Sequence, residues 1–128
     1  MRRNETPRYR GLTLRVLGSS GPALGPGKVE LMARIDATGS ISAAARAMGM
    51  SYRRAWQLVE SLNRTFNRPV VTTAVGGAHG GGARVTPFGR RLAVRYRAME
   101  RAASAAIAAD LRRIEALVRP RAHRRTGR

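Results

Sequence analysis

Three side chains close together in the sequence, Arg53, Arg54 and Gln57, carry the hydrogen-bonding groups that recognise the edges of nucleic-acid bases. An arginine guanidinium donates two parallel hydrogen bonds to guanine, and a glutamine amide both donates to and accepts from adenine. The hydroxyl groups of the preceding Ser51 and Tyr52 suit phosphate oxygens instead. We therefore expect the first three residues to contact bases and the two hydroxyls to contact the backbone.

The charge of the whole chain favours the same kind of partner. Its 128 residues include 25 Lys+Arg against 7 Asp+Glu, a formal net charge of +18, and Lys28 is the only lysine. This excess calls for a polyanion, which means DNA, RNA or an anionic membrane. With 43% hydrophobic residues the chain can fold, and its length suits one domain with a modest core.

Several classes of site and location are excluded or disfavoured by the composition. The absence of cysteine excludes disulfides, thiol catalysis and cysteine-ligated zinc. The most apolar segment, residues 102–109, is too short to span a bilayer, and no apolar stretch follows the basic N-terminus as it does in a secretory signal. We expect a protein of the reducing cytoplasm, associated with the nucleoid, with no membrane partner.

The sequence offers little for catalysis or for a cofactor. His79 and His123 are the only histidines and lie far apart, so a metal site is not expected. The glycine-rich segment 76–82 lacks the Gly-Lys-Ser/Thr that a phosphate-binding P-loop needs. Because no Ser, His and acid are spaced as a nucleophile and its base, we expect neither an enzyme nor a cofactor-binding protein.

Turn-forming residues divide the start of the chain into a strand and a helix. Residues 12–17 alternate apolar and polar side chains, which predicts a short, half-buried strand. Residues 18–27 are rich in glycine, serine and proline and are expected to be a connector. Apolar residues at helical spacing then predict a helix over residues 26–38, which Gly39 ends.

Two further helices are expected immediately afterwards. Ser40 is a good N-cap for a short, alanine-rich helix over residues 41–48, and Gly49 suits the left-handed conformation that ends it. Ser51 is the expected N-cap of the next helix, residues 52–66. The two helices are therefore joined by a tight turn that contains glycine.

The helix over residues 52–66 is strongly amphipathic. Its predicted buried face comprises Ala55, Leu58, Val59, Leu62 and Phe66, and its opposite face Arg53, Gln57, Glu60 and Arg64. Arg54, Trp56 and Ser61 flank the polar face. Trp56 at this border either covers the edge of the core or contacts a partner, and Tyr52 has the same ambiguity.

A β-hairpin and a long helix are expected in the second half. Residues 70–75 and 83–85 predict the strands of a hairpin, and Thr86 followed by proline predicts the start of a helix. A heptad-like seam then runs to residue 118, with polar Asp110 as its one break. We expect one continuous helix over residues 89–118.

A tight helix-turn-helix whose second helix is exposed and basic is the pattern of a DNA-binding motif, and a following hairpin makes it a winged one. The expected fold is therefore mainly α with a small β-hairpin wing: a winged helix-turn-helix domain over residues 11–88, followed by the long helix. Residues 1–10 and 119–128 are expected to be a flexible basic N-terminal segment and a basic tail. The helix pair alone would also suit a solvated amphipathic surface.

Two segments carry a resemblance to a known family. LGPGKVELMARIDATGSISAAARAMGMSYRRAWQLVESLNRTF and GGAHGGGARVTPFGRRL resemble the N-terminal DNA-binding domain of the ModE family, whose winged helix is similar to that of LysR-type regulators. The resemblance covers roughly residues 12–101. It implies a bacterial transcriptional regulator, active on double-stranded DNA, with a recognition helix at about residues 51–66 and a wing at residues 76–84.

The resemblance also fixes the expected site and its limits. It implies that Ser51, Tyr52, Arg53, Arg54, Trp56 and Gln57 belong to the recognition element, and that His79 and Arg84 belong to the wing. From its place on the exposed face, Arg64 is expected to contact the DNA backbone, as is Arg84. In ModE proteins molybdate binds to C-terminal domains, and this sequence looks like a stand-alone DNA-binding half. We therefore do not expect it to bind molybdate directly.

The seam of the last helix predicts a homodimer, because its apolar residues beyond Met99 have no partner of their own in a domain this small. A helix that frays after about Ala103, in a monomer, is the alternative. Two other functions remain open: a non-specific architectural protein of the nucleoid, and an RNA-binding or adaptor module. The RNA-binding function is disfavoured because the sequence lacks an aromatic platform for stacking on single strands.

Overall fold

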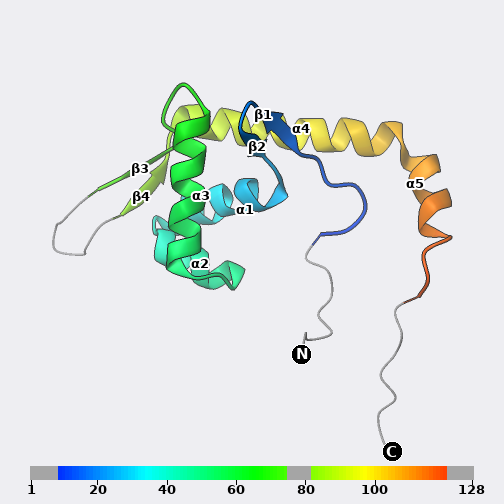
Figure 1. Ribbon diagram of the computed structural model, residues 1–128, viewed down its shortest axis with the longest axis horizontal. Coiled ribbons are helices and arrows are strands. Elements are labelled where there is room, and N and C mark those ends of the chain that lie inside the picture. The colour runs from blue at the N-terminus through cyan, green and yellow to red at the C-terminus, as the bar shows by residue number, and fades with distance from the viewer. Residues whose placement is uncertain (1–8, 75–81, 121–128) are drawn as a thin grey trace, which may run out of the picture.

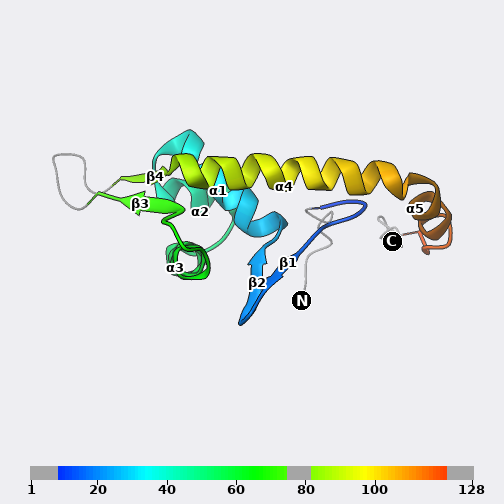
Figure 2. The same ribbon diagram turned by 90° about the horizontal axis from the view of Figure 1, so that it is seen from above.

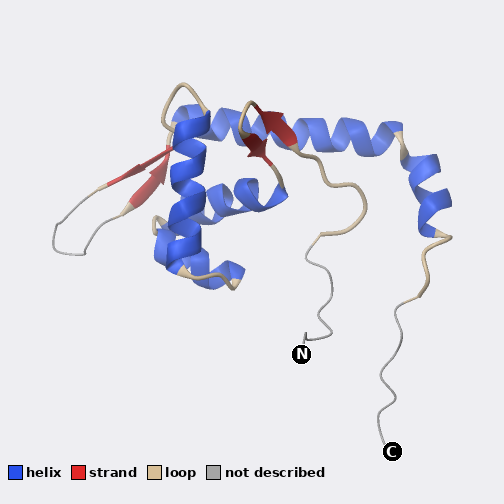
Figure 3. Cartoon of the chain, in the orientation of Figure 1, coloured by secondary structure: helices blue, strands red, loops and turns tan. Residues whose placement is uncertain are grey.

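The computed structural model describes residues 9–74 and 82–120 (Figure 1). Helices dominate it, and each of its two small sheets is an antiparallel pair of strands (Figure 3). In chain order the elements are β1 (Val16–Gly18), β2 (Gly21–Leu24), α1 (Pro26–Thr38), α2 (Ile41–Met48), α3 (Tyr52–Thr65), β3 (Val71–Thr73), β4 (Ala83–Val85), α4 (Pro87–Ala106) and α5 (Ala108–Glu115).

The predicted helix boundaries in the first half are confirmed by the capping geometry. Ser40 and Ser51 accept hydrogen bonds on their side chains from the backbone N–H groups of Ala43 and Arg54, each at 3.0 Å. Gly39 and Gly49 end α1 and α2 with φ values of 69° and 68°, which a residue with a Cβ rarely adopts. Local sequence signals therefore set where α1 and α2 end and where α2 and α3 begin.

The core lies where α1, α2 and α3 meet the base of the β3–β4 hairpin and the first turns of α4. The apolar faces of these elements supply it, as their helical spacing requires. Its most deeply buried larger side chains are Val29, Leu31, Met32, Ile35, Val59, Leu62, Val70, Val71 and Tyr96. Leu58, Phe66, Phe88 and Leu92 pack around its edge.

The β3–β4 hairpin is fixed to the end of α1. Val71 pairs with Val85 and Thr73 with Ala83 in the antiparallel register. The N–H of Ala83 also donates to the carbonyl oxygen of Gly39 at 2.9 Å. The hairpin therefore extends from the helix-turn-helix as a wing, as expected, although its turn lies outside the described residues. The strand predicted over residues 70–75 is too long, because Val70 and Ala74 are not part of β3.

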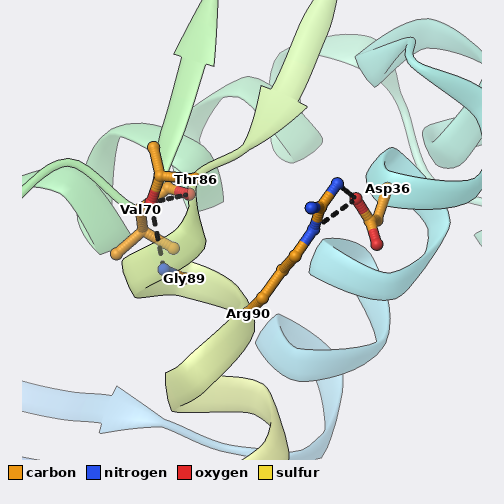
Figure 4. Close-up of polar contacts among 5 residues, drawn as sticks. All are labelled: Asp36, Val70, Thr86, Gly89 and Arg90. Atoms are coloured by element: carbon orange, nitrogen blue, oxygen red, sulfur yellow. Dashed lines mark hydrogen bonds and ion pairs between the residues drawn. The ribbon is translucent and has the colours of Figure 1, made fainter.

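The start of α4 is locked against both the hairpin and α1 (Figure 4). The Thr86 hydroxyl donates to the carbonyl oxygens of Pro69 at 2.7 Å and Val70 at 3.2 Å, and accepts from the N–H of Gly89 at 3.0 Å. One turn later, the guanidinium of Arg90 donates to the Asp36 carboxylate through two nitrogens, at 2.8 and 3.2 Å. This end of α4 is thus held from two sides.

The predicted strand over residues 12–17 is wrong in extent. Strand β1 covers only Val16–Gly18, and the expected connector contains a second strand, β2, that pairs with it. The carbonyl oxygen of Leu14 accepts a hydrogen bond from the Tyr96 hydroxyl at 2.7 Å. Leu14 is therefore bonded to helix α4 and is not part of a β-strand. Ala23 and Leu24 are buried, which holds a Gly/Pro-rich segment extended.

The prediction of one continuous helix over residues 89–118 is also wrong. The helix begins at Pro87 and breaks at Ile107, whose φ of −107° and ψ of 9° are not helical, and α5 turns sharply away from the axis of α4 (Figures 1 and 2). After the break, Leu111 lies against Gly11: a Cβ at Gly11 would be 3.7 Å from Leu111 Cδ2. The bend lets this half-buried leucine reach the N-terminal segment, which a straight helix would not.

Of the helices that the structure describes, none combines the length and the apolar character that crossing a membrane requires.

Candidate DNA-binding site

The exposed face of α3 is flanked by two hairpins. In Figures 1 and 2, the β3–β4 wing lies on one side of this helix and the β1–β2 hairpin on the other. Arg53, Arg54 and Gln57 are exposed on α3, whereas Ala55, Val59 and Leu62 are buried on its opposite face. The helix therefore presents its polar side chains outward between two projections.

Most of the predicted DNA-binding residues lie at the N-cap and in the first two turns of α3. The Ser51 hydroxyl caps the helix, and Tyr52 stands 56% exposed beside it. Trp56 is 37% exposed, so its indole lies partly against the protein and partly in solvent. Both aromatic rings can thus present surface to a partner.

On one flank, Asn63 joins α3 to the wing. Its side-chain oxygen accepts from the N–H groups of Val70 at 2.8 Å and Val71 at 3.1 Å, and its side-chain nitrogen donates to the Val71 carbonyl oxygen at 2.8 Å. These three hydrogen bonds connect one side chain of α3 to the backbone at the start of β3. The wing therefore has a fixed position relative to the recognition helix.

On the other flank, Lys28 joins α3 to the β1–β2 hairpin. Its ammonium group donates to the carbonyl oxygen of Pro22 at 2.8 Å and to the hydroxyl of Ser61 at 3.1 Å. Partial burial lowers the pKa of Lys28 below its ordinary value, and the nearby positive charge of Arg54 lowers it further. The single lysine of the chain thus links β2, α1 and α3.

A groove of about 1140 Å³ lies between this hairpin and α3. Its charged lining comprises Arg15, Lys28, Arg54, Arg64 and one acid, Glu60. Gln57, a predicted base-contacting residue, also lines it. The groove therefore opens onto the same face of α3 that carries the predicted site, and its charge is predominantly positive.

The structure brings together the predicted residues of α3 and places Arg84 of the wing to one side of them. Arg64 is exposed at the far end of the same face, and Arg84 is exposed on β4 between the buried Ala83 and Val85. His79 falls outside the described residues.

A known protein family matches the part of the sequence that forms these elements. The model of the lysR family of bacterial regulatory helix-turn-helix proteins matches residues 27–90, which run from the start of α1 to the start of α4. The chain belongs to this family. The predicted LysR-like helix-turn-helix class is thereby confirmed, and the nucleoid-type alternative gains no support.

Curated relatives of this LysR-family chain include regulators of the ModE type. The molybdenum-pterin-binding protein MopB of Rhodobacter capsulatus is 49% identical over 85 residues, which are 66% of this chain and 32% of that protein. The DNA-binding transcriptional dual regulator ModE of Escherichia coli K12 is 38% identical over 71 residues, or 56% of this chain and 27% of that protein. The chain thus spans about a third of the length of these relatives.

Among solved structures, ArgP from Mycobacterium tuberculosis aligns with a TM-score of 0.44 and 23% sequence identity. The alignment covers 62% of this chain and 29% of that one.

Sequence reasoning missed the residues that hold this LysR-type site in place. Asn63 and Lys28 are ordinary polar residues in the sequence, and only the fold shows that each bridges α3 to a hairpin. The sequence contained one indication for Asn63: it is an uncharged polar residue directly after the apolar Leu62 in the predicted helix. For Lys28, its being the sole lysine was the only sign.

Proposed function

We propose that this chain is a sequence-specific transcriptional regulator that places α3 in the major groove of double-stranded DNA and its glycine-rich wing on the backbone or in the minor groove. The observation that carries the proposal is the exposed face of α3, which bears Arg53, Arg54 and Gln57. The helix itself lies between the two hairpins (Figure 2). A major groove about 12 Å wide admits one helix whose side chains reach the base edges. The family match and the net charge of +18 support it.

Within this site we assign different roles to different side chains. Arg53, Arg54 and Gln57 contact base edges, because their side chains form the paired hydrogen bonds that guanine and adenine offer. Ser51, Tyr52, Arg64 and Arg84 contact the backbone and set the register of the helix. Trp56, at the wing side of α3, covers the edge of the interface, and His79 acts from the wing.

We further propose that the chain acts as a homodimer through its C-terminal helices. Apolar side chains remain exposed along them, with Met99 at 44%, Val94 at 68% and Ile114 at 62% exposure. Exposed apolar surface of this kind marks an interface, and a second copy across a two-fold axis is the simplest partner. Two recognition helices would then address half-sites separated by about one helical turn of DNA, ~34 Å, or a multiple of it.

Action on chromosomal DNA implies a cytoplasmic location on the nucleoid. The names of MopB and ModE refer to molybdenum-pterin binding and to transcription control in those proteins. For this chain we propose the control of transcription without direct binding of molybdate.

Selection of bound duplexes from a random pool, at a stated salt concentration, tests the proposed function. A regulator should enrich a pseudo-palindromic sequence and bind it at least ~10³-fold more tightly than random DNA. An architectural protein would bind selected and unselected duplexes alike, and that result would overturn the proposal.

A further inference from the structure

We propose that the β1–β2 hairpin forms a second contact to the DNA backbone, on the side of α3 opposite the wing. The proposal rests on the proposed function and extends it to residues that lie before the helix-turn-helix. The ligand is a phosphodiester group of the same duplex, bound at the groove between Arg15, on the hairpin side, and Arg64, on α3.

The position of the hairpin follows from the two flanks of α3. At 100° per residue, Ser61 and Asn63 stand about 160° apart on the arc that contains the exposed Arg64, and the buried Leu62 lies on the other arc. Asn63 binds strand β3, and Ser61 binds Lys28, which in turn holds Pro22 of strand β2. The two hairpins therefore bracket the helix, and DNA that reaches its exposed face approaches both.

The charge of the groove suits a phosphate. Four basic side chains line it, Arg15, Lys28, Arg54 and Arg64, against the single carboxylate of Glu60. Arg54 and Lys28 are close enough to repel each other, because the arginine contributes to the lowered pKa of the lysine. A phosphate in the groove relieves this repulsion, since a nearby negative charge favours both cations.

The tip of the hairpin can come close to a sugar-phosphate backbone. Ser19 and Ser20 are exposed there, and their hydroxyl groups can donate to phosphate oxygens. Gly21 follows with a φ of 134°, and a Cβ on it would meet no atom within 4 Å. The tip is thus small, polar and open to solvent, beside the basic groove.

Salt dependence provides a direct test with the full 128-residue chain. We would measure binding to a labelled mixed-sequence duplex of ~30 base pairs over a range of salt concentrations, for the parent and for Arg15→Ala. Each phosphate contact contributes about 0.9 to the slope of log K against log salt. Arg15→Ala is expected to flatten this slope by about 0.9 and to weaken binding to random and selected duplexes by the same factor.

Two further variants make the test sharp. Arg101→Ala removes the same charge from the exposed surface of α4, outside the groove, and should keep the parent slope. Ser20→Arg adds a cation at the hairpin tip and should steepen the slope by about 0.9, whether or not the Arg15 variant folds.

The outcomes separate this inference from the proposed function. If Arg15→Ala behaves like Arg101→Ala, or Ser20→Arg leaves the slope unchanged, the second contact is wrong. A loss confined to the selected duplex would make Arg15 a base-contacting residue, which also overturns it. If the parent shows no preferred sequence but the slopes change as expected, the second contact stands and the sequence-specific function fails.

Discussion

The backbone of Gly89 lies so close to Val70 that a Cβ on the glycine would stand 2.6 Å from the Val70 carbonyl oxygen and 3.1 Å from its Cγ1. The same Cβ would be 2.8 Å from Cγ1 of Val85. The first turn of α4 can therefore pack against the base of the wing only because this residue has no side chain (Figure 4).

We expect Gly89→Ala to destabilise the protein by about 1–3 kcal/mol, the usual cost of overpacking. Alanine favours a helix over glycine by about 1 kcal/mol, but a clash with backbone cannot be relieved by a side-chain rotation. Gly27→Ala, in the first turn of α1, is the matched control, because its Cβ would meet nothing within 4 Å. Urea denaturation should show the first variant less stable than the parent and the second equally or more stable.

Tyr96→Phe tests the contact between α4 and the N-terminal segment. The phenol is 1% exposed and donates to the Leu14 carbonyl oxygen at 2.7 Å, so its loss should cost about 0.5–1.5 kcal/mol at neutral pH. Burial raises the pKa of Tyr96, with Glu100 adding to the rise, so the folded state holds this proton more tightly than the unfolded one. Its contribution is therefore complete below the ordinary pKa of 10.0 and is lost as the pH rises through the folded-state pKa.

In the Phe variant this alkaline loss of stability should be smaller than in the parent. Denaturation curves at neutral and strongly alkaline pH would measure the difference. Tyr52→Phe, at an exposed position, should behave as the parent does at both. An unchanged pH dependence in Tyr96→Phe would contradict the role assigned to burial.

Alanine replacement along α3 should separate base contacts from backbone contacts. We expect Arg53→Ala, Arg54→Ala or Gln57→Ala to lose ~1–3 kcal/mol of discrimination at one base pair of the selected duplex. Arg84→Ala, on the wing, should weaken binding to all sequences alike. Competition binding with single-base-pair variants of the duplex measures both effects. A uniform loss for one of the α3 variants would assign that residue to the backbone.

The proposed homodimer predicts a concentration-dependent mass in sedimentation equilibrium for this 13.9 kDa chain. The double change Met99→Asp and Ile114→Asp should give a folded monomer, because it places charges on two exposed apolar positions. Leu17→Asp is the control: this leucine is 73% exposed but lies on β1, away from the C-terminal helices. If the parent chain remains monomeric at protein concentrations on the order of tens of micromolar, the proposed interface is excluded.

We expect the chain to show no saturable micromolar binding of molybdate or tungstate in calorimetry. Selective binding of an oxyanion requires convergent donors shielded from water. Within residues 9–74 and 82–120, no polar or charged residue is buried. The basic groove should therefore bind these anions only weakly and in competition with salt, and a saturable isotherm would refute this expectation.

The parts of this fold that could be predicted from the sequence are those set by neighbouring residues. Ser40, Gly49 and Ser51 act within one helical turn, so the bounds of α2 and the start of α3 follow from local patterns. The apolar face of α3 could be predicted for the same reason. The residues that project from it are those expected, whereas their contacts with bases remain predictions.

The parts that could not be predicted depend on residues far away in the chain. Strand β2 lies in a segment that looks like a turn, and it is extended because Ala23 and Leu24 enter the core. The break at Ile107 accompanies the contact between Leu111 and Gly11, which no local pattern indicates. The groove formed with Lys28 likewise exists only because β2, α1 and α3 meet.

Helix α4 is held by hydrogen bonds and an ion pair at its start, whereas beyond its far end the contact described above is only the packing of Leu111 against Gly11, so α4 behaves mechanically like a cantilever with a lightly supported end. Contacts from Thr86 to Tyr96 fix its base, while residues 97–106 continue for about 15 Å beyond the last of these anchors. A tilt of about 10° at Tyr96 would therefore carry the end of α4 sideways by about 3 Å. In a dimer joined near that end, such small tilts would let the two winged helix-turn-helix domains adjust to half-sites of slightly different spacing. Each domain would keep its own internal structure.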